Sequence, residues 1–202
     1  MKKKILIALL LLIPFISITL AVIFRLTAVP TNEEVISEVR ALPCYKTEVE
    51  YIVKNSRGED REQTTQYYSE KKGARIDFGE DRIKFYKDGN IKVKDNISNK
   101  EYDVEAELDV LHSLAFMENL LSYPIDANSI KEGQEEWGER IYIELSLELF
   151  LKNDQLYKAR VFIDKDKKVP IGVIVYDKEG NDRLRIIYKN FEKLEEIDSD
   201  LL

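Results

Sequence analysis

Cys44 and His112 are the only cysteine and histidine of the chain, and together they suggest a nucleophile and its base. A catalytic cysteine needs a base within hydrogen-bond reach and usually a third group that orients this base. Nothing in the sequence places the two residues together, because Cys44 begins a predicted strand and His112 lies on a predicted helix. We therefore interpret Cys44 as a small buried hydrophobic residue and His112 as a helix-surface or core residue.

Carboxylate pairs are the second constellation that invites a chemical interpretation. A glycosidase uses two carboxylates that flank the scissile bond, but the chain has 38 acidic residues and no spacing selects one pair. The segments Asp164–Asp166 and Asp177–Asp182 resemble calcium loops superficially, although the second lacks the spacing of an EF-hand. We predict that both are hairpin turns with solvated charges. A hydrolase of envelope polymer that uses an unassigned carboxylate pair remains an alternative function.

Composition narrows the chemistry further. One Cys and one His among 202 residues exclude a disulfide within the chain and a zinc site built from several such ligands. Eight Gly leave little room for a glycine-rich nucleotide loop, and no Gly-x-Ser-x-Gly, His-Glu-x-x-His or phosphate-loop motif occurs. The sequence therefore predicts a protein that is not an enzyme and has no catalytic residue, metal or cofactor.

The first 25 residues contain four basic side chains and no acidic one, and these basic residues flank a long apolar run. Within Ile5–Phe24 only Pro14, Ser17 and Thr19 are not apolar. A helix of this length spans about 30 Å, the thickness of the hydrocarbon core of a bilayer. We predict a single-pass anchor in the cell membrane, with the three leading lysines in the cytoplasm and the C-terminal domain outside it.

A cleaved signal peptide is the competing interpretation of this segment. Its apolar region is normally about 7–15 residues long and precedes a small-x-small cleavage site. The run here is longer, Leu26-Thr27-Ala28 fits such a site poorly, and no Cys follows directly for lipidation. We therefore divide the chain into an anchor at residues 1–25, a linker at 26–30 and an extracytoplasmic domain at 31–202.

The part of the chain beyond the anchor is acidic. The net charge of the whole chain is −7, and the four basic residues of the N-terminal segment leave −11 for the remainder. Lysines alternate with acids instead of forming a patch, so we expect neither nucleic-acid binding nor broad adsorption to anionic lipid. The 44% hydrophobic residues are enough to fill a core.

Two helices are predicted in this domain. Thr31–Glu34 has the form of a capping box, and the apolar residues that follow recur at helical spacing as far as Pro43. Leu108–Leu121 has a second apolar stripe, which is typical of an amphipathic helix of about four turns. Ser129–Gly138 is polar, and we expect it to be irregular or a short helix.

From Cys44 onward, apolar and polar residues alternate with a period of two, which is typical of half-buried strands. Turn sequences such as Asp88-Gly89-Asn90 separate these segments, and Asp-Gly is a strong hairpin signal. About nine or ten antiparallel strands are expected. The predicted strands are Cys44–Lys54, Glu62–Ser69, Ala74–Phe78, Ile83–Lys87, Ile91–Asp95, Tyr102–Val104, Ile141–Leu149, Tyr157–Ile163, Ile171–Tyr176 and Leu184–Phe191.

Most aromatic residues of the domain fall on these predicted strands. There they are expected to build the core and to form cross-strand pairs. Because few helices must cover a large sheet, we also expect an open, curved sheet whose concave face forms an apolar groove capped by the helices.

The order of these parts resembles a known family. A helix precedes the long strand that begins Cys44–Tyr51, and the hairpin sequence Tyr86–Asn90 precedes a helix at Leu111–Leu121. The chain ends with the segments Pro170–Asn181 and Ile187–Phe191. This layout resembles the LolA-like lipoprotein-carrier superfamily and, within it, the GerS-like germination lipoproteins of spore-forming bacteria.

The resemblance covers residues 31–202 and implies an α+β fold that is mainly antiparallel β. The expected architecture is an incomplete, half-open LolA-like barrel packed on two or three helices, here preceded by one transmembrane helix. In the carriers the cavity holds lipoprotein acyl chains, and the germination branch acts in spore cortex breakdown through partner proteins. The implied function is non-enzymatic binding of a lipid acyl chain or of an envelope or spore protein. An envelope-stress sensor, a role that the same superfamily serves, is a further alternative.

Cys44 has one further interpretation outside the cytoplasm, where disulfides persist. Because the chain has a single cysteine, any such bond must join two chains. Cys44 is therefore a candidate for an intermolecular disulfide in a homodimer.

Overall fold

The computed structural model describes residues 14–19, 29–135, 137–198 and 200–202. The chain divides into two units, Met1–Thr31 and Asn32–Leu202. In the first unit residues 14–19 are helical. Among the described residues no helix is long and apolar enough to cross a membrane. Most of the predicted anchor, Ile5–Phe24, lies outside the described residues, so the anchor remains a prediction.

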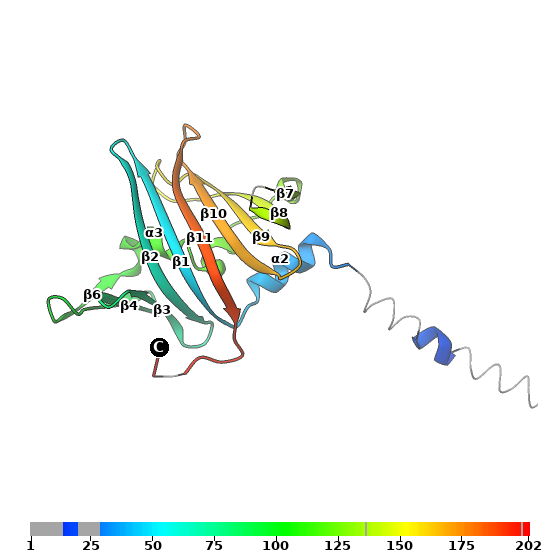
Figure 1. The fold of residues 1–202 in the computed structure, drawn as a ribbon, viewed down its shortest axis with the longest axis horizontal. Coiled ribbons are helices and arrows are strands. Elements are labelled where there is room, and N and C mark those ends of the chain that lie inside the picture. Colours follow the sequence, from blue (N-terminus) through cyan, green and yellow to red (C-terminus); the bar gives the residue numbers. More distant parts are fainter. Residues whose placement is uncertain (1–13, 20–28, 136, 199) are drawn as a thin grey trace, which may run out of the picture. The chain divides into compact units, whose positions relative to one another are not determined.

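In the described part of the second unit, eleven antiparallel strands form one open sheet (Figure 1). Their order across the sheet is β6-β5-β4-β3-β2-β1-β11-β10-β9-β8-β7. The predicted antiparallel β architecture is confirmed, and the sheet does not close. The strands are β1 (Cys44–Asn55), β2 (Gly58–Ser69), β3 (Gly73–Phe78), β4 (Arg82–Lys87), β5 (Asn90–Asp95), β6 (Lys100–Glu105), β7 (Lys131–Glu135), β8 (Gly138–Glu148), β9 (Lys158–Asp164), β10 (Val169–Tyr176) and β11 (Asp182–Lys193).

The two-residue alternation places one set of side chains of each strand against the core. In β1 this set includes Tyr45, Val49 and Tyr51, all of which are buried, whereas Glu48 on the opposite face is exposed. The β1–β2 pairing is unbroken from Cys44 to Asn55, so the alternation keeps one register along both strands. We call the face on which Tyr51 lies the inner face and the opposite one the outer face.

Helices cover the inner face of the sheet (Figure 1). The predicted first helix is confirmed as α2 (Asn32–Arg40), whose residues Val35, Ile36 and Val39 are buried. The predicted single helix at Leu108–Leu121 is wrong. The segment forms three short pieces, namely the 3₁₀ turn η1 (Ala106–Leu108), α3 (Val110–Ser113) and α4 (Met117–Leu121).

Two residues with non-helical backbone angles break this segment. Asp109 has φ −109° and ψ 54°, and Phe116 has φ −81° and ψ 121°. Each break lets the chain turn, so that apolar residues before and after Phe116 all point into the core. Leu114, Ala115, Phe116, Met117, Leu120 and Leu121 are all buried. These buried residues therefore fill the part of the inner face on which α3 and α4 pack.

β7 is a strand that the sequence did not indicate. Ser129–Gly138, expected to be irregular or a short helix, contains the end of the 3₁₀ turn η2 (Ala127–Ser129) and then β7, which pairs with β8. The segment lacks apolar alternation, so its pairing comes from contact with β8. Gly133 permits this contact, because a Cβ there would lie 2.4 Å from the ring of Tyr142.

A smaller apolar cluster lies apart from the main core and is formed by Tyr142, Phe162, Ile171 and Ile174, with Trp137 packed against it. The ring centroids of Trp137 and Phe162 are 5.1 Å apart. Gly172 makes room for the indole, since a Cβ at this position would lie 2.6 Å from Trp137 Cη2.

Replacing Gly172 by Val should push Trp137 away from the sheet. The new side chain would overlap the indole and approach the Ile186 carbonyl oxygen at 3.0 Å, at an expected cost of about 1–3 kcal/mol. Trp137 is the only tryptophan, so a red shift of its emission measures the displacement. Thr65→Val on β2 also introduces a valine, at nearly constant volume and remote from this cluster, and should leave the emission unchanged. An unshifted spectrum in Gly172→Val would contradict the proposed packing.

Candidate functional site

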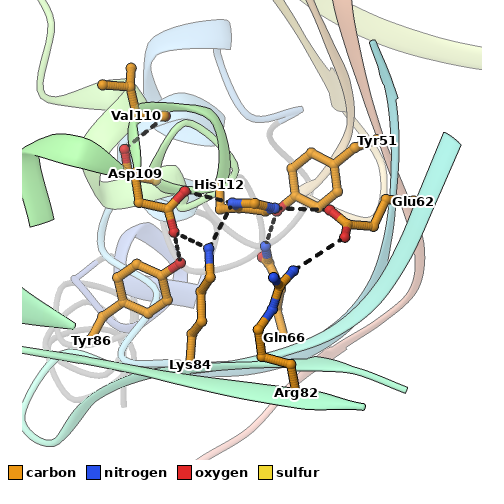
Figure 2. Close-up of polar contacts among 10 residues, drawn as sticks. Tyr51, Glu62, Gln66, Arg82, Lys84, Tyr86, Asp109, Val110 and His112 are labelled. Atoms are coloured by element: carbon orange, nitrogen blue, oxygen red, sulfur yellow. Dashed lines mark hydrogen bonds and ion pairs between the residues drawn. The ribbon is translucent and has the colours of Figure 1, made fainter. Parts of the chain in front are cut away.

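Five ionisable side chains meet on the inner face, where α3 packs over β2 and β4 (Figure 2). They are Glu62 of β2, Lys84 and Tyr86 of β4, Asp109 at the start of α3, and His112 within α3. We call them the His112 cluster. The side chains of Asp109, His112 and Lys84 are only 11%, 12% and 13% exposed, whereas that of Glu62 is 41% exposed. The cluster is thus a mostly buried group of charges that reaches solvent at one side.

His112 is held between two carboxylates. Its Nδ1 lies 2.6 Å from Asp109 Oδ1, and its Nε2 lies 3.0 Å from Glu62 Oε2 (Figure 2). The ring meets Tyr51 and Phe78 edge to face, with centroids 5.1 and 5.0 Å away. Burial alone would lower the pKa of His112, but the two carboxylate hydrogen bonds raise it above its ordinary value. The two carboxylates therefore stabilise the imidazolium form, which can donate from both nitrogens, although Lys84 Nζ lies 3.3 Å from Nδ1 and opposes it.

Asp109 is the hub of the cluster. Lys84 Nζ donates to Asp109 Oδ2 at 2.5 Å, and the Tyr86 hydroxyl donates to the same oxygen at 2.7 Å. Burial would raise the pKa of Asp109, but the hydrogen bonds from His112, Lys84 and Tyr86 hold it well below its usual range. The pKa of Glu62 is lowered as well, first by its hydrogen bond with His112.

Arg82 completes the exposed side of the cluster. Its Nη2 lies 3.5 Å from Glu62 Oε1, and its guanidinium carbon lies 4.2 Å above the ring of Phe78. Glu62, Phe78 and Arg82 also line a cleft of about 470 Å³ together with Asp95 and Ile97. Arg82 thus places a further cation beside the carboxylate of Glu62, at the wall of this cleft.

This arrangement is suited to holding α3 on the sheet and lacks the features of a two-carboxylate hydrolase. Such an enzyme needs one carboxylic acid with a raised pKa to protonate the leaving group. Where the pKa of a carboxyl group among the described residues departs clearly from its ordinary value, the shift is downward. His112 has no free nitrogen with which to act as a base, because both are engaged.

The structure separates Cys44 from His112. Cys44 is the first residue of β1, and His112 packs against Tyr51, seven residues further along the same strand. At roughly 3.3 Å per residue, Cys44 and Tyr51 are about 23 Å apart along β1. Because Cys44 and Tyr51 are an odd number of residues apart, their side chains also lie on opposite faces of the strand. His112 packs on the face of Tyr51, away from Cys44. The dyad weighed from the sequence is not formed, and Cys44 is buried as expected. His112, expected to be an ordinary surface or core residue, instead lies at the centre of a charged cluster.

An intermolecular disulfide at Cys44 stays a prediction. Because the side chain is 6% exposed, two chains can join there only if the start of β1 opens. A dimer band on a non-reducing gel that Cys44→Ser abolishes is the expected outcome. A band that persists in the variant, or a monomer in both proteins, would dismiss the disulfide.

The two acidic segments form turns, as predicted, but the expectation of solvated charges is wrong for Asp164 and Asp177, which are only 3% and 4% exposed. Asp164 Oδ1 accepts hydrogen bonds from the backbone amides of Asp166 and Lys167 at 3.1 and 2.8 Å. Asp177 Oδ1 accepts from the amides of Glu179 and Asn181 in the same manner. Each carboxylate therefore satisfies the backbone of its own loop. Among the described residues no group of three His, Cys, Asp or Glu side chains is placed to hold a metal ion.

Two further clefts lie where the helices that cover the inner face meet the sheet or one another. One, of about 410 Å³, lies between the β2–β3 turn, the β4–β5 turn and α4, with Tyr68 and Phe116 in its wall. The other, of about 500 Å³, lies beside α2 and is more apolar. It is lined by Ile36, Leu121, Tyr123, Pro124, Ile125 and Ile130, among other residues. Both volumes are within the range typical of ligand pockets.

The stability of the domain should depend on pH through the His112 cluster. The lowered pKa values of Asp109 and Glu62 stabilise the fold above their ordinary values of 3.8 and 4.5, and this stabilisation is lost as pH falls. The raised pKa of His112 stabilises the fold below 6.5, and this stabilisation is lost as pH rises through the pKa of the folded state. Urea unfolding should therefore show the largest difference between wild type and His112→Gln between pH 4.5 and 6.5. A difference that is independent of pH would contradict this coupling.

Solved structures of other proteins are similar to this chain. An uncharacterised conserved protein from Thermus thermophilus is 10% identical, with 84% of this chain and 91% of that chain covered and a TM-score of 0.56. A LolA superfamily protein, NE2245 of Nitrosomonas europaea, is 9% identical over 85% and 96% of the two chains, with a TM-score of 0.46. A chain in the structure of the CwlD amidase of Clostridioides difficile in complex with the GerS lipoprotein is 19% identical over 81% and 96%, with a TM-score of 0.47.

A LolA superfamily protein and the GerS complex, the groups that the sequence resembles, are thus among the similar solved structures. No curated protein matches the chain. The model of a family described as YdcC-like sporulation proteins matches residues 2–202. The chain therefore belongs to the YdcC-like family of sporulation proteins.

Proposed function

We propose that this chain is a non-enzymatic domain, anchored outside the cytoplasm, that binds a protein partner during spore formation or germination. The observation that carries the proposal is the inner face of the open sheet. Its apolar side chains are covered by α2, α4 and the loops between helices, and its charges are neutralised within the His112 cluster. The covered inner face therefore leaves the outer face, the edges and the clefts for recognition. Membership of a sporulation family supports the biological setting.

Binding of a lipid acyl chain is the second candidate. The apolar cleft beside α2 favours it, because Ile36, Leu121 and Ile125 line a space of about 500 Å³. The filled inner face argues against the deeper cavity that a carrier would need. Titration of the full-length protein with a fluorescent fatty acid tests this candidate. Saturable binding that Ile125→Glu abolishes would favour lipid over protein as the ligand.

The location can be tested with the single cysteine. In a Cys44→Ser background, Lys152→Cys places one thiol in the exposed β8–β9 loop. A membrane-impermeant maleimide should label this thiol on intact cells, and the label should stay with the membrane fraction. If the thiol is labelled only after the cells are lysed, it lies in the cytoplasm and the proposed topology is wrong. Labelled protein that is released into the medium would overturn the anchor.

The partner can be identified by crosslinking the full-length protein in sporulating cells and purifying it from solubilised membranes. Proteins and lipids are both identified, and the same procedure on vegetative cells is the control. We expect one protein to be recovered in stoichiometric amount from sporulating cells. Recovery of the chain alone would contradict the proposed function. Release of products from purified peptidoglycan by the isolated protein would show that it is an enzyme.

A further inference from the structure

The strand β6 is one of the two ends of the open sheet, and its pairing with β5 is regular along all six residues (Figure 1). The amide of Ala106 donates to the Gly89 carbonyl oxygen at 3.2 Å, which fixes the phase of the hydrogen bonds between the two strands. Hydrogen-bonded and non-hydrogen-bonded pairs alternate along two antiparallel strands. Because Ala106 and Gly89 form a hydrogen-bonded pair, Glu101, Asp103 and Glu105 occupy the non-hydrogen-bonded positions. Their backbone N–H and C=O groups therefore point away from β5, toward the free edge.

The opposite edge is less suited to pairing. β7 has five residues, and its register with β8 shifts between Gly133 and Glu135. Irregularity of this kind protects an edge, because a bulged strand presents no continuous row of donors and acceptors. Of the two ends of the described sheet, β6 is thus the one prepared to accept a further strand.

The side chains of β6 define what such a strand must carry. Glu101, Asp103 and Glu105 share the outer face, and all three are exposed. Glu101 pairs with Lys92 at 3.0 Å, whereas Asp103 and Glu105 make no ion pair with another described residue. On the inner face Tyr102 is 47% exposed and Val104 is partly buried, and the exposed Lys100 stands at the start of the strand. An incoming strand would therefore face carboxylates on one side and apolar surface on the other.

The same charges argue against a second copy of the chain as the occupant. Two antiparallel β6 strands that pair symmetrically about Asp103 would set Asp103 against Asp103 and Glu101 against Glu105. Symmetric pairing about Glu101 or Glu105 also opposes two like charges at its centre. Like charges placed directly opposite are destabilising, so pairing of β6 with the β6 strand of a second copy is disfavoured.

We propose that β6 is the docking edge for an extended segment of a partner protein in which basic residues alternate with apolar ones. The segment would add as a twelfth strand, with its backbone bonded to Glu101, Asp103 and Glu105 and its cations beside their carboxylates. This inference rests on the proposed function and names the chemistry of the partner.

The probe is a capped seven-residue peptide of alternating lysine and valine, labelled with a fluorophore. A matched peptide has glutamate in place of lysine. Anisotropy with the full-length protein in detergent should show that the lysine peptide binds at least about tenfold more tightly than the glutamate peptide. Bound peptide should also slow hydrogen exchange of the amides of Glu101, Asp103 and Glu105, which point outward when the edge is free.

Two variants separate backbone pairing from charge. Asp103→Pro removes one outward amide and is compatible with an edge strand, so it should weaken binding of the lysine peptide about tenfold. Asp103→Lys keeps the amide and should shift the preference toward the glutamate peptide. Equal binding of both peptides, or an unchanged affinity in both variants, would overturn the docking edge.

The docking edge and the proposed function can fail independently of each other. If a partner is recovered from sporulating cells with wild type and equally with Asp103→Pro, the docking edge fails and the function stands. If the lysine peptide binds β6 but no partner is recovered, the function fails while the edge is retained.

Discussion

Asp109→Asn should destabilise the domain by about 3 kcal/mol, measured as the loss in free energy of urea unfolding at a pH near 6. The substitution keeps the shape of the side chain and removes the charge that His112 and Lys84 share. His112 Nδ1 and Lys84 Nζ lie 2.6 and 2.5 Å from the carboxylate, and all three side chains are largely buried. Without this anion the cations of His112 and Lys84 keep only the carboxylate of Glu62, 3.0 Å from His112, in a poorly solvated site. A buried charge that is compensated incompletely costs more than the original ion pair contributed.

Asp154→Asn is the matched control for this substitution. Asp154 pairs with Lys178 at 2.6 Å, a distance close to that between Asp109 and Lys84, but the Asp154 side chain is 73% exposed. Exposed pairs of this kind contribute about 0–1 kcal/mol, because water screens them. We therefore expect the control to unfold within about 0.5 kcal/mol of wild type. Equal losses in both variants would show that the burial of the His112 cluster is unimportant.

A second substitution distinguishes loss of charge balance from loss of packing. In Asp109→Asn/His112→Gln one of the two stranded cations is removed, so part of the lost stability should return. The two residues are in contact, and a coupling energy of about 0.5–3 kcal/mol is expected between them. Strictly additive losses would contradict the view that the residues act as one unit.

The strands were predictable because their pattern is local. The alternation from Tyr45 to Val53 needs no knowledge of the partner strand, and turn residues such as Asp88-Gly89 mark where one strand ends. β7 was not predictable in this way, since its polar sequence pairs only because Gly133 lets β8 approach. The helix at Leu108–Leu121 was predicted from a correct apolar stripe. Its interruption at Asp109 and Phe116 follows from contacts with the sheet that the stripe does not encode.

The His112 cluster was largely beyond the reach of the sequence. His112 was singled out by its rarity, but Glu62 lies 50 residues earlier in the chain and Lys84 28 residues earlier. Only the register of β2, β3 and β4 brings those two side chains to one region of the inner face. One local signal was present, since Asp109 and His112 stand three residues apart on a predicted helix, a spacing at which side chains meet.

Phe116→Ala should destabilise the domain by about 3–5 kcal/mol, the largest effect that we expect from a single truncation. Phe116 is 3% exposed and lies in the extended break between α3 and α4. Its ring packs on Tyr86 at 5.3 Å and on Tyr68 at 6.2 Å, which joins the cap to β2 and β4. Removing the ring deletes both aromatic contacts and leaves a cavity that the surrounding strands fill only in part.

Phe150→Ala is the control, because it deletes the same ring from a position that is 71% exposed. Its loss should stay within about 0.5 kcal/mol, which is typical of surface substitutions. Phe116 also lines the cleft of about 410 Å³, so its removal should open that cleft into the core. An apolar fluorescent fatty acid should therefore bind Phe116→Ala more strongly than wild type. If wild type binds the fatty acid as well as the variant does, the helices that cover the inner face already open in the native protein. A lipid would then replace the protein segment as the favoured ligand.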